Sequence, residues 1–348
     1  MKRKDFLNSS ASLFTLSSVP AVTEKIINTV DNGKYGPDIL PVIPPYLKKG
    51  DRVGITSPSG YMTKEEIRPA VQLIESWGYR VIIGETIGKR DFTFGGNDEE
   101  RAADFQKMLD ESHIRAIMCA RGGYGAVRII DKLKWDRFKT KPKWIIGFSD
   151  ATVFHVHVNS NLNIASIHSK MCNSFPEDWN KAEPIQVETI QSIKKALSGE
   201  KLSYILKSNE RNKQGTGTAV LIGGNIRTLE SLAGSKTDIN TDGKILFVED
   251  TGEYMYSIDR MFWNLKRSGK LSRLNGLIVG GFKVKEDDDG DEFGKTLEDV
   301  VLEKVKRYDY PVCFDFPVGH QKNNFALKCG VRHKLVVREK DCTLTETS

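Results

Sequence analysis

The chain alternates short apolar runs with helical patterns from residue 52 to residue 147, and this alternation constrains its fold more than any other feature. Arg52 to Thr56, Tyr79 to Ile83, Ile114 to Cys119 and Trp144 to Gly147 are predicted strands. Between them, apolar spacing predicts one helix over 64–77, and Asn97 is placed to cap another that runs to Asp110. Strands that alternate with helices in this way favour an α/β fold with a parallel sheet covered on both faces.

A second region of different character follows the loop around residues 175–179. A helix over 184–197 is expected to lead into it and to end at Gly199. Further strands are expected at 219–222, 245–248, 277–279 and 312–316, and the stretch 325–337 alternates like an antiparallel ribbon. We therefore expect a C-terminal mixed α+β domain, barrel-like in form. The domain boundaries predicted from these patterns are 44–180 and 200–348.

Composition bounds the classes of function. The 348 residues fit two domains of ordinary size, and the net charge of +6 comes from interspersed charges without a basic stripe, so no nucleic-acid partner is indicated. Five widely spaced cysteines form neither a C-x-x-C pair nor a disulfide ladder, although a cysteine nucleophile stays open as an alternative. The acidic loop 286–292 lacks the glycine position of a calcium-binding EF-hand, so a solvated loop is the simpler interpretation.

Residues 1–40 are interpreted as a signal peptide and linker. A short positive segment at Lys2, Arg3 and Lys4 precedes an apolar stretch rich in serine and alanine, with small residues at 18–21 where a signal peptidase could cut. The positive segment also looks like a twin-arginine signal with one arginine replaced by lysine. We expect export to the periplasm, with a cytoplasmic location and a merely disordered or helical extension as alternatives. No later segment approaches transmembrane length, so no integral membrane segment is expected in the mature protein.

The strongest local motif is Gly147-Phe148-Ser149-Asp150, which follows an apolar strand and precedes a predicted helix. A serine on a sharp strand-to-helix turn is exposed at a helix N-terminus, where backbone amides can stabilise an oxyanion. Ala151 replaces the second glycine of the usual G-x-S-x-G pattern. Ser149 is thus a candidate nucleophile, and a helix N-cap is the alternative.

A glycine-rich loop, Arg121-Gly122-Gly123-Tyr124-Gly125, follows the third predicted strand. Bare backbone amides at this edge of a parallel sheet can approach a ligand closely. Neither the phosphate-loop pattern nor G-x-G-x-x-G is present, so no nucleotide cofactor is implied. An oxyanion donor or substrate clamp and a purely structural turn remain open.

Two further segments place acid and base candidates after predicted strands. Glu249 ends an apolar strand, and His320 follows a turn containing Gly319. Glu253 and His168 are local rivals for the same roles. The pattern His155-Val156-His157 invites a zinc interpretation, but the two rings diverge by about 200° on a helix and no H-E-x-x-H motif accompanies them.

Taken in order, these segments resemble the serine LD-carboxypeptidases, including the microcin-immunity peptidases. The matching pieces run from the Pro44-Pro45 entry through the glycine-rich loop and Gly147-Phe148-Ser149-Asp150. They continue with Gly223-Gly224-Asn225, Phe247-Val248-Glu249-Asp250 and Pro317-Val318-Gly319-His320. The resemblance implies a Rossmann-like N-terminal domain, a C-terminal domain that faces it across a cleft, and a homodimer that needs no metal.

The resemblance also implies roles for individual residues. Ser149 would be the nucleophile, Glu249 the orienting acid and His320 the general base. The Asp150 amide and an amide from Gly122 or Gly123 would form the oxyanion hole, with Tyr124 beside the substrate. The implied activity is removal of the terminal D-alanine from murein tetrapeptide in cell-wall recycling.

Two features depart from the family pattern. Lys170 places a positive charge where family members carry a neutral residue, in the segment His168-Ser169-Lys170-Met171. The predicted export also differs from cytosolic recycling. Two alternatives therefore stay open: a peptidase of the same fold that acts on a peptide–nucleotide antibiotic, and a muropeptide-binding protein without catalysis.

Overall fold

The structure is a computed structural model that describes residues 41–347. The predicted signal peptide and linker, residues 1–40, lie outside the described residues. Among the helices that the structure describes, none combines the length and apolar character that crossing a membrane requires. The predicted domain boundaries at 44–180 and 200–348 stay predictions.

The first sheet contains six strands in the order β11-β5-β4-β3-β1-β2. Its strands are β1 (Arg52–Thr56), β2 (Arg80–Ile83), β3 (Ile114–Cys119), β4 (Trp144–Gly147), β5 (Ser166–His168) and β11 (Leu327–Cys329). All neighbouring pairs are parallel except β11 with β5. The strands β1, β3 and β4 are almost wholly buried, as their unbroken apolar runs predict for a sheet covered on both faces.

The helices of this half are α1 (Lys64–Ser76), α2 (Asp98–Asp110), α3 (Ala126–Ile129), α4 (Asp136–Thr140), α5 (Thr152–Val156) and α6 (Pro184–Ser198). Two of the long helices, α1 and α2, begin at residues whose side chains cap them. Thr63 caps α1 and Asn97 caps α2, each in a capping box with the glutamate three residues later. Gly199 ends α6 with a φ of 89°, a left-handed conformation that glycine adopts without strain.

The second sheet has seven strands in the order β10-β9-β8-β7-β12-β13-β6. They are β6 (Ser203–Lys207), β7 (Gly215–Asn225), β8 (Ile245–Glu253), β9 (Gly276–Val284), β10 (Val312–Cys313), β12 (Arg332–Val337) and β13 (Asp341–Glu346). The four strands from β10 to β7 pair in parallel, and β12, β13 and β6 extend the sheet antiparallel. The predicted class, an N-terminal parallel-sheet domain followed by a C-terminal mixed domain, is confirmed.

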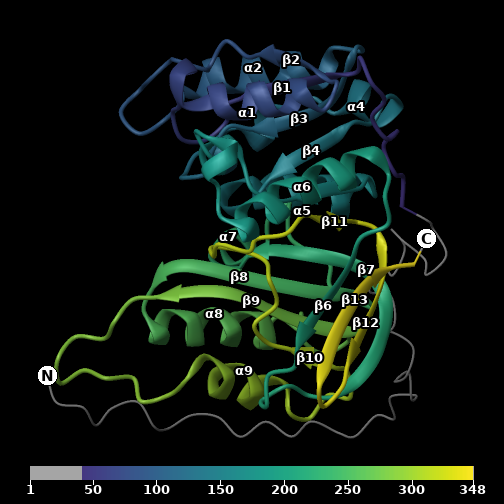
Figure 1. Ribbon diagram of the computed structural model, residues 1–348. Helices are drawn as coiled ribbons and strands as arrows, with labels where there is room; N and C mark the ends of the chain where they lie inside the picture. Colours follow the sequence, from purple (N-terminus) through teal and green to yellow (C-terminus); the bar gives the residue numbers. More distant parts are fainter. Residues whose placement is uncertain (1–40, 348) are drawn as a thin grey trace, which may run out of the picture. The chain divides into compact units, whose positions relative to one another are not determined.

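Successive side chains of β8 point to opposite faces of the second sheet, and each face packs against a different apolar cluster. Leu246 and Val248 join the apolar cluster that includes α8 (Met255–Arg267) and α9 (Leu297–Val305), which lie side by side in Figure 1. Ile245 and Phe247 join the opposite cluster, with side chains of β12 and β13. Glu249 continues this second set, so its carboxylate emerges on the face opposite α8 and α9. The short helix α7 (Ile226–Ser231) follows β7.

Two of the expected strands differ from the structure. The stretch 325–337 is not one ribbon, because β11 pairs with β5 in the first sheet while β12 pairs with β7 and β13 in the second (Figure 1). Gly330, with a φ of 81°, separates the two strands. The strand expected at 312–316 ends at Cys313, because Phe314 donates its amide to the Asn212 side chain instead of to a neighbouring strand.

Candidate active site

Ser149 lies on a strained turn directly after β4. Its φ is 61°, a left-handed conformation that costs a non-glycine residue about 1–2 kcal/mol. A single turn of 3-10 helix, Ser149–Ala151, then leads into α5. The turn is tight: a Cβ on Gly147 would lie 2.8 Å from the Cβ of Ala151, so both positions require small residues. The structure therefore places Ser149 on the sharp strand-to-helix turn that its motif predicts.

The glycine-rich loop packs against this serine. A Cβ on Gly122 would lie 3.0 Å from the Ser149 Cβ and 3.1 Å from its Oγ, so the backbone of Gly122 approaches the hydroxyl closely. Among residues 41–347, the amides of Gly122, Gly123 and Asp150 donate no hydrogen bond. These N–H groups are thus available to an oxygen bound beside Ser149. Tyr124 is 52% exposed, and its ring packs against Phe94 at the rim.

The Asp150 side chain has a structural role that its sequence position did not predict. Its buried Oδ2 accepts hydrogen bonds from Ser59 Oγ at 2.6 Å and from the Ala126 amide at 2.8 Å. Burial raises the pKa of this carboxyl above its ordinary value. Ser59 follows β1, and Ala126 begins the helix after the glycine-rich loop. Asp150 therefore joins the serine turn to both neighbouring loops.

Glu249 and His320 meet although 71 positions separate them. The His320 Nδ1 hydrogen-bonds to Glu249 Oε2, and the His320 backbone amide donates to the same oxygen at 3.2 Å. The Glu249 side chain is fully buried, whereas the His320 side chain is 17% exposed. Because Nδ1 is engaged by the carboxylate, Nε2 is the ring nitrogen left to face a substrate.

The loop that carries His320 is held by backbone contacts with the end of β9. Gly281 donates its amide to Val318 O at 2.8 Å, and Gly281 and Gly319 form a parallel bridge. Gly319 has a φ of 99°, and a Cβ there would lie 2.4 Å from the Glu249 Cβ. Only glycine therefore fits at this position. The imidazole is held on a fixed turn over the buried carboxylate.

Aromatic and hydrogen-bond contacts bring these two halves together. The His320 ring lies 4.9 Å, between centroids, from the ring of Phe148, the residue before Ser149. The amide of Asn225, at the end of β7, donates to Thr152 Oγ1 in α5 at 3.0 Å. Within residues 41–347, Ser149 Oγ makes no hydrogen bond with His320. Such contacts are often long before substrate binds.

Glu253 and His168, the alternative candidates for the acid and the base, lie in different surroundings from Glu249 and His320. Glu253 is four residues beyond Glu249 on β8, 26% exposed and 3.8 Å from Arg227. His168 is fully buried between Phe148 and Phe247, and within residues 41–347 neither ring nitrogen has a hydrogen-bond partner. Burial holds its pKa well below the ordinary value, so the ring is neutral. Neither rival forms an acid–imidazole pair.

The His155-Val156-His157 pattern is accounted for by packing. His155 is buried, with its ring nitrogens bonded to Ser166 Oγ and Gly147 O, both at 2.9 Å. His157 stacks on Trp135 instead. Among the described residues, no group of histidine, cysteine and acidic side chains is placed to hold a metal ion.

All five cysteines are free and buried. Burial raises the pKa of the Cys119 thiol, which packs beneath the serine turn. A hydrogen bond from Cys313 lowers the pKa of Cys342 to about 6, but Cys342 lies within β13, away from the glycine-rich loop. The structure therefore gives no cysteine the accessible position that a nucleophile requires.

Asn225 and Asp250 form a buried pair beside Glu249, and no functional role for either side chain follows from the sequence. Asn225 Nδ2 donates to Asp250 Oδ1 at 2.9 Å, and Asn225 also caps α7. Burial raises the pKa of Asp250 to about 6. The available signal was the Gly223-Gly224-Asn225 motif at the end of a predicted strand. A Cβ on Gly224 would lie 2.5 Å from Thr152 Oγ1, so the glycine allows β7 to approach α5.

A serine on a strained turn, free amides beside it and a buried carboxylate–imidazole pair are the components of a serine hydrolase site. Comparison with known proteins specifies the class further. Residues 53–169 match the LD-carboxypeptidase N-terminal domain, and residues 218–335 match the LD-carboxypeptidase C-terminal domain. The chain belongs to the LD-carboxypeptidase family.

Individual relatives are distant but cover most of the chain. A probable murein peptide carboxypeptidase of Bacillus subtilis is 29% identical over 307 residues, which are 86% of this chain and 93% of the relative. The microcin C7 self-immunity protein of Escherichia coli is 25% identical over 334 residues, covering 88% of this chain and 96% of the relative. The crystal structure of muramoyltetrapeptide carboxypeptidase from Oxalobacter formigenes superposes with a TM-score of 0.75 at 25% identity, covering 85% and 99% of the two chains.

Proposed function

We propose that this protein is a serine carboxypeptidase that releases the terminal D-alanine from murein tetrapeptides. The observation that carries the proposal is the buried Glu249–His320 pair, which lies on Phe148 beside the strained Ser149 turn. The substrate assignment is supported by the relatives from Bacillus subtilis and Oxalobacter formigenes, whose names specify murein peptides. The bond cut would be the amide between an L-centre and the D-residue.

In the proposed acylation step, Ser149 Oγ attacks the carbonyl carbon of the scissile amide while His320 Nε2 accepts the hydroxyl proton. The negative charge that develops on the carbonyl oxygen is stabilised by the amides of Asp150 and of Gly122 or Gly123. Glu249 stabilises the imidazolium and holds its tautomer. His320 then gives its proton to the departing amine, and D-alanine leaves.

In the proposed deacylation step, a water molecule replaces D-alanine and His320 accepts a proton from it. The resulting hydroxide attacks the ester carbon, and the same amides stabilise the second tetrahedral intermediate. His320 returns the proton to Ser149 Oγ as the ester bond breaks. The products are free D-alanine and the murein tripeptide, and the chain's own residues supply every proton transfer.

The direct test is D-alanine release. The protein is incubated with murein tetrapeptide, and free D-alanine is quantified with a D-amino-acid oxidase assay. A tetrapeptide that ends in L-alanine is the matched substrate control. We expect release from the D-terminated peptide alone. If the protein binds the tetrapeptide by calorimetry but releases no D-alanine, it is a muropeptide-binding protein and the proposal is wrong.

A second candidate function is hydrolysis of a peptide–nucleotide antibiotic. The similarity to the microcin C7 self-immunity protein favours it, because that relative covers as much of the chain as the murein peptidases do. Measuring kcat/KM for murein tetrapeptide and for an aminoacyl sulfamoyl adenosine in parallel separates the two functions. A higher value for the nucleotide conjugate would replace our proposal with the second candidate.

We also propose that the protein is exported to the periplasm. The features at residues 2–21 support delivery across the cytoplasmic membrane, where the enzyme would meet murein peptides in the periplasm. The homodimer implied by the family resemblance stays a prediction. Fractionation of cells that express the full chain tests export, and recovery in the cytoplasm alone would contradict it.

A further inference from the structure

Lys170 is a half-buried cation that forms no ion pair with any acidic side chain of residues 41–347. Its Nζ donates one hydrogen bond, to the backbone oxygen of Gln321 at 2.7 Å. Within the described part of the chain, no carboxylate lies at ion-pair distance from it. An ammonium group carries three N–H donors, so two of them remain available. A partly buried charge is costly unless it is paired, so a bound anion would stabilise Lys170.

The position of Lys170 places this charge beside the candidate base. Gln321, which accepts its hydrogen bond, directly follows His320 in the chain. The Lys170 Nζ also lies 5.8 Å from the centroid of the Phe148 ring, the same ring that the His320 imidazole contacts. Lys170 therefore lies against the loop that carries the candidate base and near the residue that precedes Ser149.

In the described part of the chain, the neighbouring charged groups do not form an ion pair with Lys170. Lys322 is paired with Glu183, whose two carboxylate oxygens both lie 2.9 Å from its Nζ. Glu249 is engaged by His320, and Lys283 adds a further positive charge nearby. Burial, reinforced by Lys283 and opposed by Glu249, lowers the pKa of Lys170 to about 8, so the ammonium form still dominates at neutral pH.

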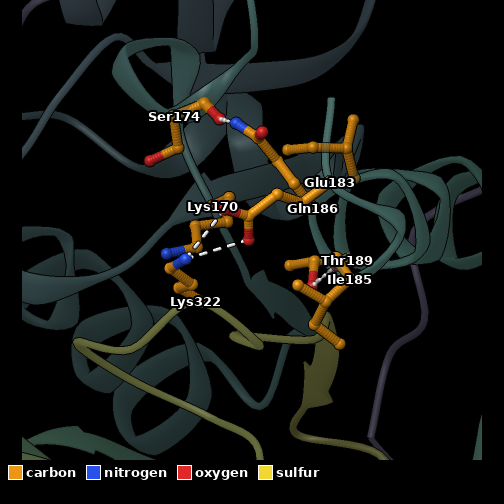
Figure 2. A pocket seen from close by; sticks show the side chains of 8 residues that line it. Lys170, Ser174, Glu183, Ile185, Gln186, Thr189 and Lys322 are labelled. Carbon is orange, nitrogen blue, oxygen red and sulfur yellow. Dashed lines mark hydrogen bonds and ion pairs between the residues drawn. The ribbon is translucent and has the colours of Figure 1, made fainter. Parts of the chain in front are cut away.

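A pocket of about 290 Å³ extends from Lys170. Figure 2 shows the side chains of Lys170 and Lys322 at one side of it, and Gln186, Ile185 and Thr189 of α6 also line it. The lining includes both charged and apolar side chains. The pocket thus offers room for an amino-acid residue whose charged end would lie against Lys170.

The chemistry of the proposed reaction defines what that charged end is. His320 must deliver a proton to the amine of the leaving D-residue, and in an amino acid the α-carboxylate is separated from that amine by a single carbon. We infer that Lys170 binds the terminal carboxylate of the leaving residue and thereby restricts the enzyme to the ends of peptides. This inference rests on the proposed carboxypeptidase function.

The test compares two substrates that differ only in this charge, murein tetrapeptide with a free terminal carboxylate and the same peptide with a terminal carboxamide. We expect native protein to prefer the free acid strongly. Lys170→Met should lower kcat/KM for the acid by about 10- to 100-fold, the range of a hydrogen bond to a charged group. The same variant should keep kcat/KM for the carboxamide peptide within about threefold of the native value, so the preference for the free acid is lost.

Lys170→Gln provides a second variant with a polar side chain, and a thermal unfolding scan verifies that each variant folds. The matched control is Lys181→Met, which removes a lysine whose side chain is 85% exposed and should leave the preference unchanged. Native protein without a preference for the acid, or Lys170 variants that retain it, would overturn the inference while leaving D-alanine release intact. Failure of native protein to release D-alanine would instead refute the proposed function.

Discussion

The buried carboxylate of Glu249 is the part of the site whose removal has the best-defined consequence. Glu249→Gln keeps the shape of the side chain and retains an oxygen that can accept from His320 Nδ1. It removes the negative charge that faces the imidazolium formed when Ser149 loses its proton. One carboxylate oxygen, Oε1, has no hydrogen-bond partner among the residues that the structure describes, so the new amide nitrogen replaces no existing hydrogen bond there.

The magnitude follows from the interaction between the two charges. Unit charges about 4 Å apart attract by about 4 kcal/mol at an effective dielectric constant of about 20. Because this attraction exists only once the imidazole is protonated, its loss raises the barrier and not the binding energy. Since about 1.4 kcal/mol corresponds to a factor of ten, kcat should fall by about a thousandfold while KM changes little.

The assay is D-alanine release from murein tetrapeptide, with kcat and KM determined separately. Glu253→Gln is the matched control, because it makes the same substitution four residues along β8, where the side chain is paired with Arg227 instead of a histidine. We expect the control to stay within about threefold of native protein. A Glu249→Gln variant that retains a tenth of native kcat, or a control that loses as much activity, would refute the assignment of the acid.

Two further predictions concern stability. Gly319→Ala should lower the free energy of unfolding, measured by urea denaturation, by about 2–4 kcal/mol. The φ of 99° disfavours any side chain, and the new Cβ would lie 2.4 Å from the Cβ of Glu249. An unchanged denaturation midpoint would contradict this prediction. Asp250→Asn should stabilise the protein by up to about 3 kcal/mol at pH 7.5 and not at pH 3.5. Burial raises the pKa of Asp250 in the folded state to about 6, so ionisation of this carboxyl destabilises the native protein as pH rises from about 4 to 6. Equal stability of the variant and the native protein at pH 7.5 would contradict this prediction.

Local features of the sequence predicted much of the first sheet and its helices. The capping box at Asn97 and Glu100 is a contact between residues three positions apart, so the motif itself specifies the helix start. The strand at Trp144–Gly147 and the turn at Ser149 were likewise predictable from adjacent residues. At these positions, the interactions that decide the structure lie within a few residues of one another.

Contacts between distant segments could not be predicted in the same way. The alternation over 325–337 indicates strands but not their partners, and Leu327–Cys329 pairs with β5 more than 150 positions earlier. A Cβ on Gly330 would lie 2.9 Å from Asn159 Nδ2 and 3.1 Å from Ala165 Cα, so the change of sheet depends on a tertiary contact. Period-two patterning specifies a face and leaves the choice of neighbour open.

The residues of the candidate site also differ in whether nearby sequence predicts them. Ser149 had a local signal, whereas Glu249 and His320 were selected through the family resemblance, with Glu253 and His168 as rivals. Only the structure shows that Glu249 meets His320, because this contact requires β8 and the loop after β10 to converge. The bond from Ser59 to Asp150, across 91 positions, had no sequence signal at all.

The central claim is that Ser149 is the nucleophile of a D-alanine-releasing peptidase. The most direct measurement is D-alanine release from murein tetrapeptide by Ser149→Ala, compared with native protein at matched concentration and with thermal unfolding of both recorded. We predict a nearly unchanged unfolding midpoint, because serine and alanine both carry the strain of the left-handed turn, and a loss of at least about a thousandfold in kcat. A folded Ser149→Ala variant that releases D-alanine at a rate near that of native protein would contradict the account.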